Sequence, residues 1–206
     1  YYIREELKKS SNLKKYDHLV HFALTSEDIN SLAYAILLRD AQIIYITKLD
    51  LIIKEINKRA RAWSAIPMLA RTHGQAASPS TLGKEMNVFV QRLKRQGEQL
   101  RNMKPLAKFG GATGNFHTLE ISDAGVDWLT QTKRFLALFK VEQNSITTQI
   151  EPHDGIAEIA HCIQRINNIL IDFNQDIWLY IANDLFTLKL KEGEVGSSTM
   201  PHKVNP

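Results

Sequence analysis

The residues best suited to catalysis lie in residues 193–206 of the printed sequence, GEVGSSTMPHKVNP. This stretch combines hydroxyls, an ammonium and an amide, in the order Ser197, Ser198, Thr199, Lys203 and Asn205. Gly193 and Gly196 permit positive φ angles, and the prolines stop helix continuation, so we expect a loop. Such a loop can bind an anion through N–H and ammonium donors, and it can supply a base. A polar C-terminal tail without function would account equally well for the composition of this stretch.

Four other polar residues, in three separate loops, could contribute hydrogen-bond donors or a proton. Thr25 and Ser26 supply hydroxyls, His73 supplies an imidazole that can donate or accept a proton, and Gln149 supplies an amide. We expect each at the end of a long helix, where ends from different subunits can meet in an antiparallel assembly. Taken alone, Thr25 and Ser26 are explained as helix caps, His73 as a surface residue, and Gln149 indicates nothing.

The first element that must position these groups is a long helix beginning at Thr25. A hydroxyl N-cap followed by two acids satisfies free N–H groups and matches the sign of the helix dipole. Apolar residues recur with a period of 3.6 from Ile29 to Trp63, and no glycine or proline interrupts the pattern before Pro67. The pattern predicts one helix over this span, which needs packing partners along its whole length.

The second long helix is expected after a polar loop at residues 71–75. Ser78 and Pro79 are predicted to be its N-cap and its first residue. Its apolar face runs from Leu82 to Met103 and lies opposite a basic face. We interpret the basic face as solvated, because little aromatic interleaving supports binding to nucleic acid.

A shorter helix and a third long helix are expected in the rest of the chain. Ser122 and Asp123 are predicted to cap the shorter helix, which ends near Lys140. Asp154 is predicted to cap the third long helix, whose apolar residues recur with helical spacing until about Leu190.

The pattern as a whole indicates the all-α fold class, as a long antiparallel helical bundle. No stretch alternates with a period of two, so no parallel sheet is expected. The glycine-rich stretch at residues 109–115 lacks the lysine and flanking strand of a phosphate-binding loop. We expect its glycines to unwind a helix or to allow a close approach between segments. The long apolar faces exceed what three helices can bury, which favours association of subunits, with D2 symmetry as the expected arrangement.

Composition limits the class of protein further. The chain has 206 residues, a net charge of +4 and 44% hydrophobic residues, which is typical of one globular domain. The single cysteine, Cys162, excludes a disulfide framework and favours a reducing compartment, so we expect a cytoplasmic protein in which this residue packs in the core. His18 and His21 have no second pair at zinc-like spacing, so no metal site is expected. No apolar run is long enough to span a membrane.

The stretch GSSTMPHKVNP closely resembles the signature loop of the fumarase/aspartase superfamily. Enzymes of that superfamily eliminate fumarate from a succinyl group by cleaving a C–N or C–O bond. The resemblance implies that Ser197 is the catalytic base and that Lys203 and Asn205 bind a substrate carboxylate. It also implies that the helical bundle is the central domain of that superfamily. His202 fills a variable position, which is histidine in the adenylosuccinate lyases and the carboxymuconate cycloisomerases.

Four stretches between residues 18 and 206 are similar to the bacterial adenylosuccinate lyase family: HFALTSEDIN, RTHGQAASPSTLGKEM, TTQIEPHD and GEVGSSTMPHKVNP. The histidine of THGQ is the general acid in that family, which implies this role for His73. The family binds substrate through the Thr-Ser pair and the glutamine of TTQ, which implies that Thr25, Ser26 and Gln149 bind substrate. Further substrate contacts are implied at three positions: Thr72, Ser198 and the backbone of Val204.

The resemblance implies a lyase of purine biosynthesis that releases fumarate from adenylosuccinate and from the succinyl-carboxamide ribotide SAICAR. It implies no cofactor and no metal, and a homotetramer with shared active sites that binds neither nucleic acid nor membrane. A carboxymuconate cycloisomerase or an argininosuccinate lyase is an alternative from the same superfamily. A non-catalytic helical oligomerisation scaffold is an alternative of a different class.

We expect residues 1–206 to form a single central helical domain, within which residues 193–206 are the signature loop. The chain begins with Tyr-Tyr-Ile rather than Met, and it ends at Pro206, the last residue of the signature. We therefore expect it to be a piece of a longer protein, truncated at both ends.

Overall fold

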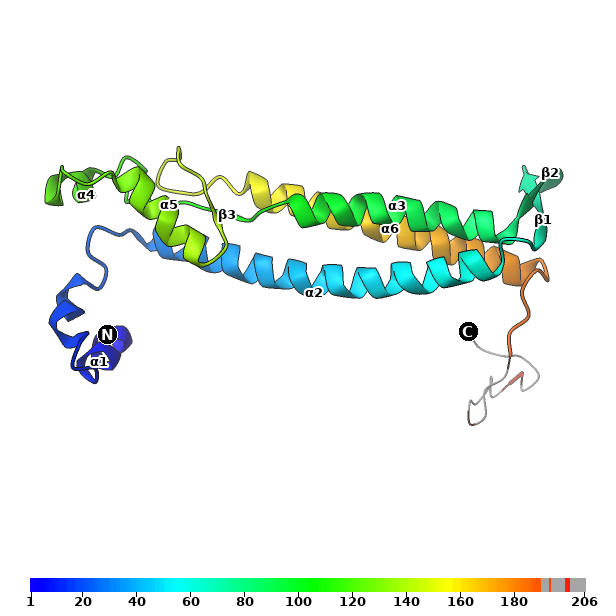
Figure 1. Ribbon diagram of the computed structural model, residues 1–206, viewed down its shortest axis with the longest axis horizontal. Coiled ribbons are helices and arrows are strands. Elements are labelled where there is room, and N and C mark those ends of the chain that lie inside the picture. The colour runs from blue at the N-terminus through cyan, green and yellow to red at the C-terminus, as the bar shows by residue number, and fades with distance from the viewer. Residues whose placement is uncertain (190–192, 194–198, 201–206) are drawn as a thin grey trace. The chain divides into compact units, whose positions relative to one another are not determined.

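A computed structural model of the chain describes residues 1–189, 193, 199 and 200, and most of its regular structure is helical. Three long helices dominate Figure 1: α2 (Ser26–Ala62), α3 (Leu82–Asn102) and α6 (Asp154–Ala182). The other elements are short: α1 (Tyr2–Lys8), a 3-10 helix (Lys14–Leu19), β1 (Pro67–Thr72), β2 (Gln75–Thr81), β3 (Leu106–Ala107), α4 (His117–Ser122), α5 (Trp128–Leu138) and β4 (Glu142–Gln143). The predicted all-α fold class is confirmed.

The chain folds as two compact units, each with its own packed interior. Unit 1 comprises residues 1–52 and 97–162, and unit 2 comprises residues 53–96 and 163–206. Each of the three long helices contributes residues to both units. None of the helices in the described part of the chain is long and apolar enough to cross a membrane.

Helix α2 covers the span that the 3.6-residue period predicted, from Ser26 to Ala62. The helix has two acids in its first turn and two arginines in its last turn. These side-chain charges are opposite in sign to the partial charges of the helix dipole at the same ends, which stabilises the helix. Asp28 closes the N-terminus, because its Oδ2 accepts a hydrogen bond of 2.8 Å from the backbone N–H of Thr25. An acid within the first turn thus contributes to the cap, in the manner of one half of a capping box.

A β-hairpin occupies the region where a polar loop and the start of the second helix were predicted (Figure 1). β1 and β2 pair antiparallel, with Thr72 opposite Gln75 at the turn. Ser78 and Pro79 therefore lie within β2, and the prediction that they begin a helix is wrong, since α3 begins at Leu82. The strands are mostly exposed, so burial imposes no alternation of apolar and polar residues on their sequence. Proline is tolerated because a two-stranded sheet has only edge strands.

Helix α5 begins later than predicted, because its N-cap is Asp127 rather than Ser122 or Asp123. The Asp127 Oδ1 accepts a hydrogen bond of 3.0 Å from the backbone N–H of Thr130, as expected of a capping carboxylate. Ser122 and Asp123 instead lie at the end of α4, where Asp123 is the C-terminal cap residue. The sequence offers two capping candidates close together, and composition does not distinguish them.

Helix α6 begins at Asp154, as predicted, but it ends at Ala182 rather than near Leu190. Asp184 has a positive φ of 57°, and the backbone N–H of Leu185 donates 2.8 Å to the carbonyl of Tyr180. This arrangement is a Schellman-type helix end, which places an aspartate in the left-handed position usually taken by glycine. The apolar period continues beyond the helix end, so the sequence pattern predicted too long a helix.

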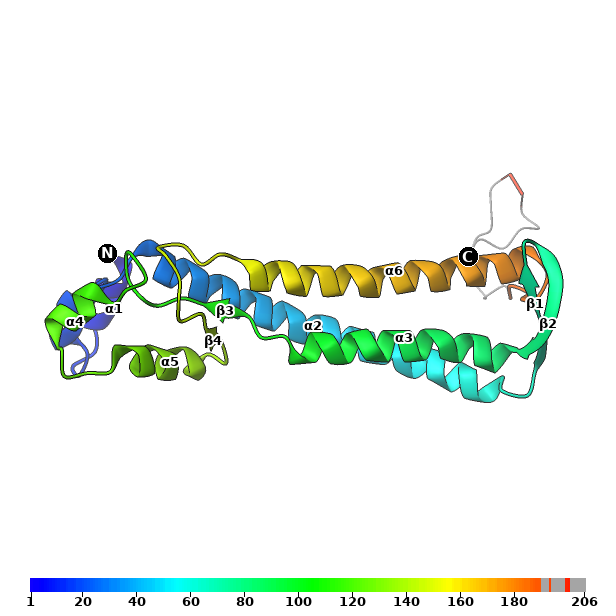
Figure 2. The same ribbon diagram turned by 90° about the horizontal axis from the view of Figure 1, so that it is seen from above.

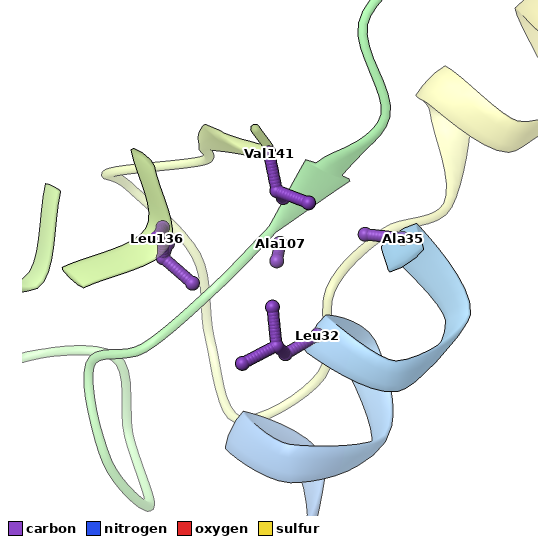
Figure 3. Packing of buried hydrophobic residues seen from close by; sticks show 5 residues of the cluster. All are labelled: Leu32, Ala35, Ala107, Leu136 and Val141. Atoms are coloured by element: carbon purple, nitrogen blue, oxygen red, sulfur yellow. The ribbon is translucent and has the colours of Figure 1, made fainter. Parts of the chain in front are cut away.

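The core of unit 1 joins α2, α5 and the segments around β3 and β4. Figure 3 shows the cluster, which consists of Leu32, Ala35, Ala107, Leu136 and Val141. β3 and β4 are paired in parallel over two residues each (Figure 2), so the expectation of no parallel pairing is wrong at this point. The pairing is too short to produce a sequence pattern. Cys162 is fully buried in the same unit, as predicted.

The core of unit 2 is formed by one face of α3 against α6. Met86, Phe89, Val90 and Leu93 are buried, which confirms the apolar face predicted from the helical period. The ring of Phe89 meets that of Phe173 edge-on, with centroids 5.2 Å apart. Burial of this face is the main stabilising term available to α3, since its opposite face is largely exposed.

Candidate active site

Thr25 and Gln149 come together in unit 1, although 124 residues separate them in sequence. The side-chain Nε2 of Gln149 lies 3.5 Å from Thr25 Oγ1, at the long limit of a hydrogen bond. Ser26 is exposed and is the first residue of α2. Two hydroxyls and an amide thus surround the N-terminus of a 37-residue helix, where unpaired N–H groups favour an anion. This grouping agrees with the substrate-binding role that the resemblance implies.

The glycine-rich stretch holds the Gln149 segment in place. Gly114 has a φ of +77°, and a methyl group in place of its hydrogen would lie 2.2 Å from the carbonyl oxygen of Thr147. The same methyl group would lie 2.8 Å from the carbonyl oxygen of Thr148. Only glycine therefore fits, both for its backbone conformation and for the close approach. The prediction that these glycines allow a close approach between segments is confirmed at Gly114.

A buried ion pair lies directly behind the N-terminus of α2. Lys108 Nζ is 2.7 Å from Asp28 Oδ1, and both side chains are fully buried. The lysine cancels the charge of an acid in the first turn of α2, so the positive end of the helix dipole is not offset by Asp28. Sequence reasoning missed Lys108. The available signal was a lone lysine between apolar neighbours, in the stretch LAKFGG.

A second acid at this helix end faces a histidine. His153 Nε2 lies 3.8 Å from Glu27 Oε1, and the pair is an ion pair only when the imidazole is protonated. Glu27 Oε1 is buried and has no hydrogen-bond partner among the described residues. The backbone N–H of His153 donates 2.7 Å to Glu151, and the amide of Asn144 donates 2.9 Å to the same carboxylate. Glu151 thus fixes the turn that carries His153 beside α2.

His73 lies in unit 2, at the tip of the β1–β2 hairpin. His73 and Gly74 form a two-residue turn with φ angles of 52° and 72°, as in a type I′ turn. Positive φ is uncommon for a residue with a side chain, and such strain is concentrated at functional sites. His73 and the neighbouring Thr72 are exposed, so the imidazole at the tip of the hairpin is accessible to solvent.

A cavity of ≈ 400 Å³ lies beside this hairpin within unit 2, lined in part by Arg71, Gly74, Glu85, Asp176 and Tyr180. Burial and the nearby carboxylates of Asp172 and Glu85 raise the pKa of Asp176 above its ordinary value. Burial, with the charges of Asp176 and Glu85, raises the pKa of Tyr180 to about 12. Two acids in its wall make this cavity a poor site for an anionic substrate.

The residues before the signature stretch are anchored by aromatic contacts in unit 2. The ring of Phe186 lies 5.6 Å from that of Trp63 and 5.7 Å from that of Tyr180, measured between centroids. Gly193 has a φ of +87°, which only glycine adopts readily, as its predicted loop role requires. The remaining predicted site residues, Ser197, Ser198, Lys203, Val204 and Asn205, lie outside the described residues.

The structure therefore brings together only part of the predicted set. Thr25, Ser26 and Gln149 belong to unit 1, and Thr72 and His73 belong to unit 2. Within the described ranges, no group of three His, Cys, Asp or Glu side chains is arranged to hold a metal ion. The described residues supply hydroxyl, amide, imidazole and helix-terminal N–H groups, which suit binding of an anion and transfer of a proton.

Comparison with known proteins identifies related sequences over the whole chain. The family model described as "Lyase" matches residues 2–206. The adenylosuccinate lyase of Haemophilus influenzae is 44% identical over 207 residues, covering 100% of this chain and 45% of that protein. The adenylosuccinate lyase of Buchnera aphidicola subsp. Baizongia pistaciae is 49% identical over 189 residues, covering 91% of this chain and 41% of that protein. The chain thus spans less than half the length of these relatives.

Two solved structures are similar to the fold. The fumarate lyase from Mesorhizobium sp. BNC1 matches with a TM-score of 0.71 and 25% identity, over 82% of this chain and 39% of that one. The β-carboxy-cis,cis-muconate cycloisomerase from Acinetobacter calcoaceticus matches with a TM-score of 0.70 and 25% identity, over 84% and 39%. The fold is therefore shared by a fumarate lyase and by a cycloisomerase, which are enzymes of different activity.

Proposed function

Because this chain belongs to the lyase family whose model it matches over residues 2–206, we propose that the complete protein containing it cleaves adenylosuccinate to fumarate and AMP. The confirmed membership of the fumarase/aspartase superfamily supports an elimination that releases fumarate. The observation that carries the choice of substrate is the 44–49% identity to adenylosuccinate lyases from several bacteria, over 91–100% of the chain. The same chemistry extends to SAICAR, which would yield fumarate and AICAR.

The proposed reaction is a β-elimination with separate base and acid. Ser197, as an alkoxide, removes a proton from the carbon next to the one bonded to the leaving nitrogen. The resulting carbanion is conjugated to a carboxylate, whose added negative charge Lys203 and Asn205 stabilise. The electron pair then forms the C=C bond of fumarate while the C–N bond breaks, and His73 as imidazolium protonates the leaving nitrogen. Protons and electrons balance without a cofactor or a metal.

The serine is the least usual part of this mechanism. A free serine hydroxyl is a very poor base, so the signature loop must stabilise its alkoxide when substrate is bound. Lys203 and backbone N–H groups of the loop are the proposed donors. Gly193, with its positive φ of 87°, has a backbone conformation that favours glycine at the start of this stretch.

Thr25, Ser26 and Gln149 are the proposed binding groups for an anionic part of the substrate. Their support is the grouping of Thr25 and Gln149 at the N-terminus of α2, where helix N–H groups favour negative charge. Thr72, Ser198 and the backbone of Val204 are proposed as further substrate contacts. The charge of Lys108 offsets that of Asp28, which would otherwise oppose an anion at this place.

We propose that the complete protein is a cytoplasmic homotetramer whose active sites combine residues from several subunits, with residues 1–206 in a central helical domain. Support comes from the large apolar side chains that α2 exposes within unit 1: Tyr34, Leu37, Ile43, Ile44 and Leu51. Exposed apolar surface on this scale marks an interaction site in a stable protein. No nucleic-acid or membrane partner is proposed.

The experiment that tests the function incubates the complete protein with several superfamily substrates in parallel. We expect fumarate from adenylosuccinate and SAICAR, and none from argininosuccinate. Carboxymuconate is included because a carboxymuconate cycloisomerase shares the fold with a TM-score of 0.70. Turnover of argininosuccinate or carboxymuconate instead would reassign the enzyme, and absence of all turnover would favour the oligomerisation scaffold.

A further inference from the structure

We propose that Lys108 is a positioning residue that fixes the spacing of Thr25 and Gln149 through a closed ring of contacts in unit 1. Lys108 has no exposed surface, so it cannot touch a substrate. Its effect has to pass through the groups that it holds. Two branches of contacts leave its side chain, and both end at the Thr25–Gln149 pair.

The first branch runs through Asp28. Lys108 Nζ lies 2.7 Å from Asp28 Oδ1. The other oxygen of the same carboxylate, Oδ2, accepts a hydrogen bond of 2.8 Å from the backbone N–H of Thr25. The orientation of one carboxylate is therefore shared between the lysine and the first residue of the binding pair.

The second branch runs through the glycine-rich turn. Lys108 Nζ donates 2.6 Å to the carbonyl of Gly111, whose N–H in turn donates 3.2 Å to Asp28 Oδ1. The turn continues to Gly114, which lies against the carbonyl oxygens of the two residues before Gln149. Gln149 then reaches back to Thr25 at 3.5 Å, which closes the ring.

The main chain of Lys108 is also fixed to α2. Its carbonyl accepts a hydrogen bond of 3.2 Å from Ser31 Oγ, and its N–H donates 3.3 Å to the same oxygen. Ser31 is buried one turn after Asp28. The ammonium therefore has little freedom to move away from the carboxylate. Because the lysine is held both at its main chain and at its ammonium, the ring of contacts is rigid.

A buried ion pair is weak evidence for stability, because apolar residues of similar volume often stabilise a protein as well or better. The role that we propose for this ion pair is to set geometry. One ammonium and one carboxylate orient three backbone groups, which belong to two separate segments of the chain. The consequence rests on the proposed function: if Thr25 and Gln149 bind substrate, loss of Lys108 weakens binding more than it slows the chemical step.

The test is the variant Lys108→Met in the complete protein, with KM and kcat for adenylosuccinate measured separately. We expect KM to rise by about tenfold or more while kcat changes by less than about threefold, the pattern of lost uniform binding. Lys133→Met is the matched control, since Lys133 is exposed on α5 in the same unit, and it should change neither constant. A fall in kcat with KM unchanged overturns the proposal.

Two further variants separate positioning from a folding defect. Lys108→Met combined with Asp28→Asn leaves no unpaired buried charge, and the asparagine oxygen can still accept from Thr25. Gly114→Ala breaks the ring at a different point, where the new methyl group would meet Thr147. Both should raise KM, which does not depend on the fraction of misfolded protein. A wild-type KM in the folded double variant contradicts the ring.

Hydrogen–deuterium exchange without substrate decides the inference independently of the reaction. Lys108→Met should speed exchange in peptides covering residues 21–26 and 144–150, while a peptide covering residues 163–182 is unchanged. If wild-type protein fails to cleave adenylosuccinate, the proposed function is wrong, and the exchange data still test the ring. Unchanged exchange in both loop peptides overturns the inference even if the enzyme is active.

Discussion

At the residue scale, the proposed chemistry depends on a few side chains whose environments differ. His73 is exposed on a strained hairpin turn, as suits a group that must reach a substrate. Lys108 and Asp28 are fully buried and can act only by holding other groups. The difference in burial thus matches the two proposed roles, acting on the substrate for His73 and positioning other groups for Lys108 and Asp28.

His73→Ala tests the general acid. A general acid typically contributes about 10²–10⁴-fold, so we expect kcat for adenylosuccinate to fall by that factor. The limb of the pH–rate profile on which activity falls as imidazolium loses its proton should disappear, because the titrating group has been removed. The measurement is kcat across a pH series for both proteins. A limb that persists unchanged in the variant would assign the acid to another group.

Asp176→Asn tests the electrostatics of the cavity in unit 2. Burial and the nearby Asp172 and Glu85 raise the pKa of Asp176, so its contribution to stability is present below the unfolded-state pKa and is lost as pH rises through the folded-state pKa. The neutral variant should therefore be more stable than wild type at pH 7, with an advantage that shrinks as pH falls toward about 4. Unfolding by urea at several pH values measures this difference.

The control is Asp184→Asn, since Asp184 is exposed and asparagine also tolerates its positive φ. That variant should show no comparable pH-dependent advantage. A destabilised Asp176→Asn protein at pH 7 would show that the carboxylate makes a net favourable interaction, such as with Arg92, that outweighs its burial.

At the element scale, the start of α3 and the end of α2 lie in close backbone contact at Gly83. A methyl group at Gly83 would lie 2.3 Å from the carbonyl oxygen of Ala60 and 2.6 Å from Ser64 Cα. The backbone N–H of Gly83 also donates 3.0 Å to the carbonyl of Trp63. The first turn of α3 therefore packs directly against the backbone at the end of α2.

Gly83→Ala should separate these segments and destabilise unit 2 by roughly 1–3 kcal/mol, the range typical of overpacking. Gly97→Ala is the matched control in the same helix, because its methyl group would meet side chains and no backbone: Leu49 Cδ2 at 3.1 Å and Arg101 Nη1 at 3.6 Å. The control should cost less, since a side chain can shift where backbone cannot and alanine favours the helix. Thermal unfolding of both variants measures the difference, and equal losses would refute the close-contact explanation.

The sequence predicted the elements whose apolar period is strong and long. The bounds of α2 and the buried face of α3 follow from that period, as does the burial of Cys162. The hairpin at residues 67–81 was missed because its exposed strands leave no alternating pattern. The end of α6 was missed because Asp184 ends the helix through a positive φ, while apolar residues continue beyond it.

Residue types alone did not identify the described part of the candidate site. Thr25 and Gln149 came from resemblance to a family, and the structure places them together. Lys108 was missed because a lysine in a short apolar stretch has no motif, and its meaning depends on contact with Asp28, 80 positions earlier in sequence. Long-range contacts of this kind are properties of the fold rather than of local sequence.

At the scale of the whole molecule, the 206 residues span about 45% of the length of related adenylosuccinate lyases. We expect the isolated 206-residue chain to be inactive, because the proposed active site draws on other subunits and on residues outside this span. Misplacement of a catalytic group by about 1 Å can cost 10²-fold. The measurement is fumarate release by the purified fragment at high concentration, alone and mixed with full-length Ser197→Ala protein. Activity of the fragment alone near that of the intact enzyme would refute the shared-site proposal.

The most direct test of the central claim compares fumarate release from adenylosuccinate by the complete wild-type protein and by its Ser197→Ala variant. We predict that wild type releases fumarate and AMP in equal amounts, and that the variant still binds substrate but retains less than about a tenth of kcat. A tenth corresponds to about 1.4 kcal/mol of lost transition-state stabilisation, well below what loss of a catalytic base should cost. If the wild-type protein releases no fumarate, the proposed function is wrong. If the Ser197→Ala variant retains more than about a tenth of the wild-type kcat, Ser197 is not the base.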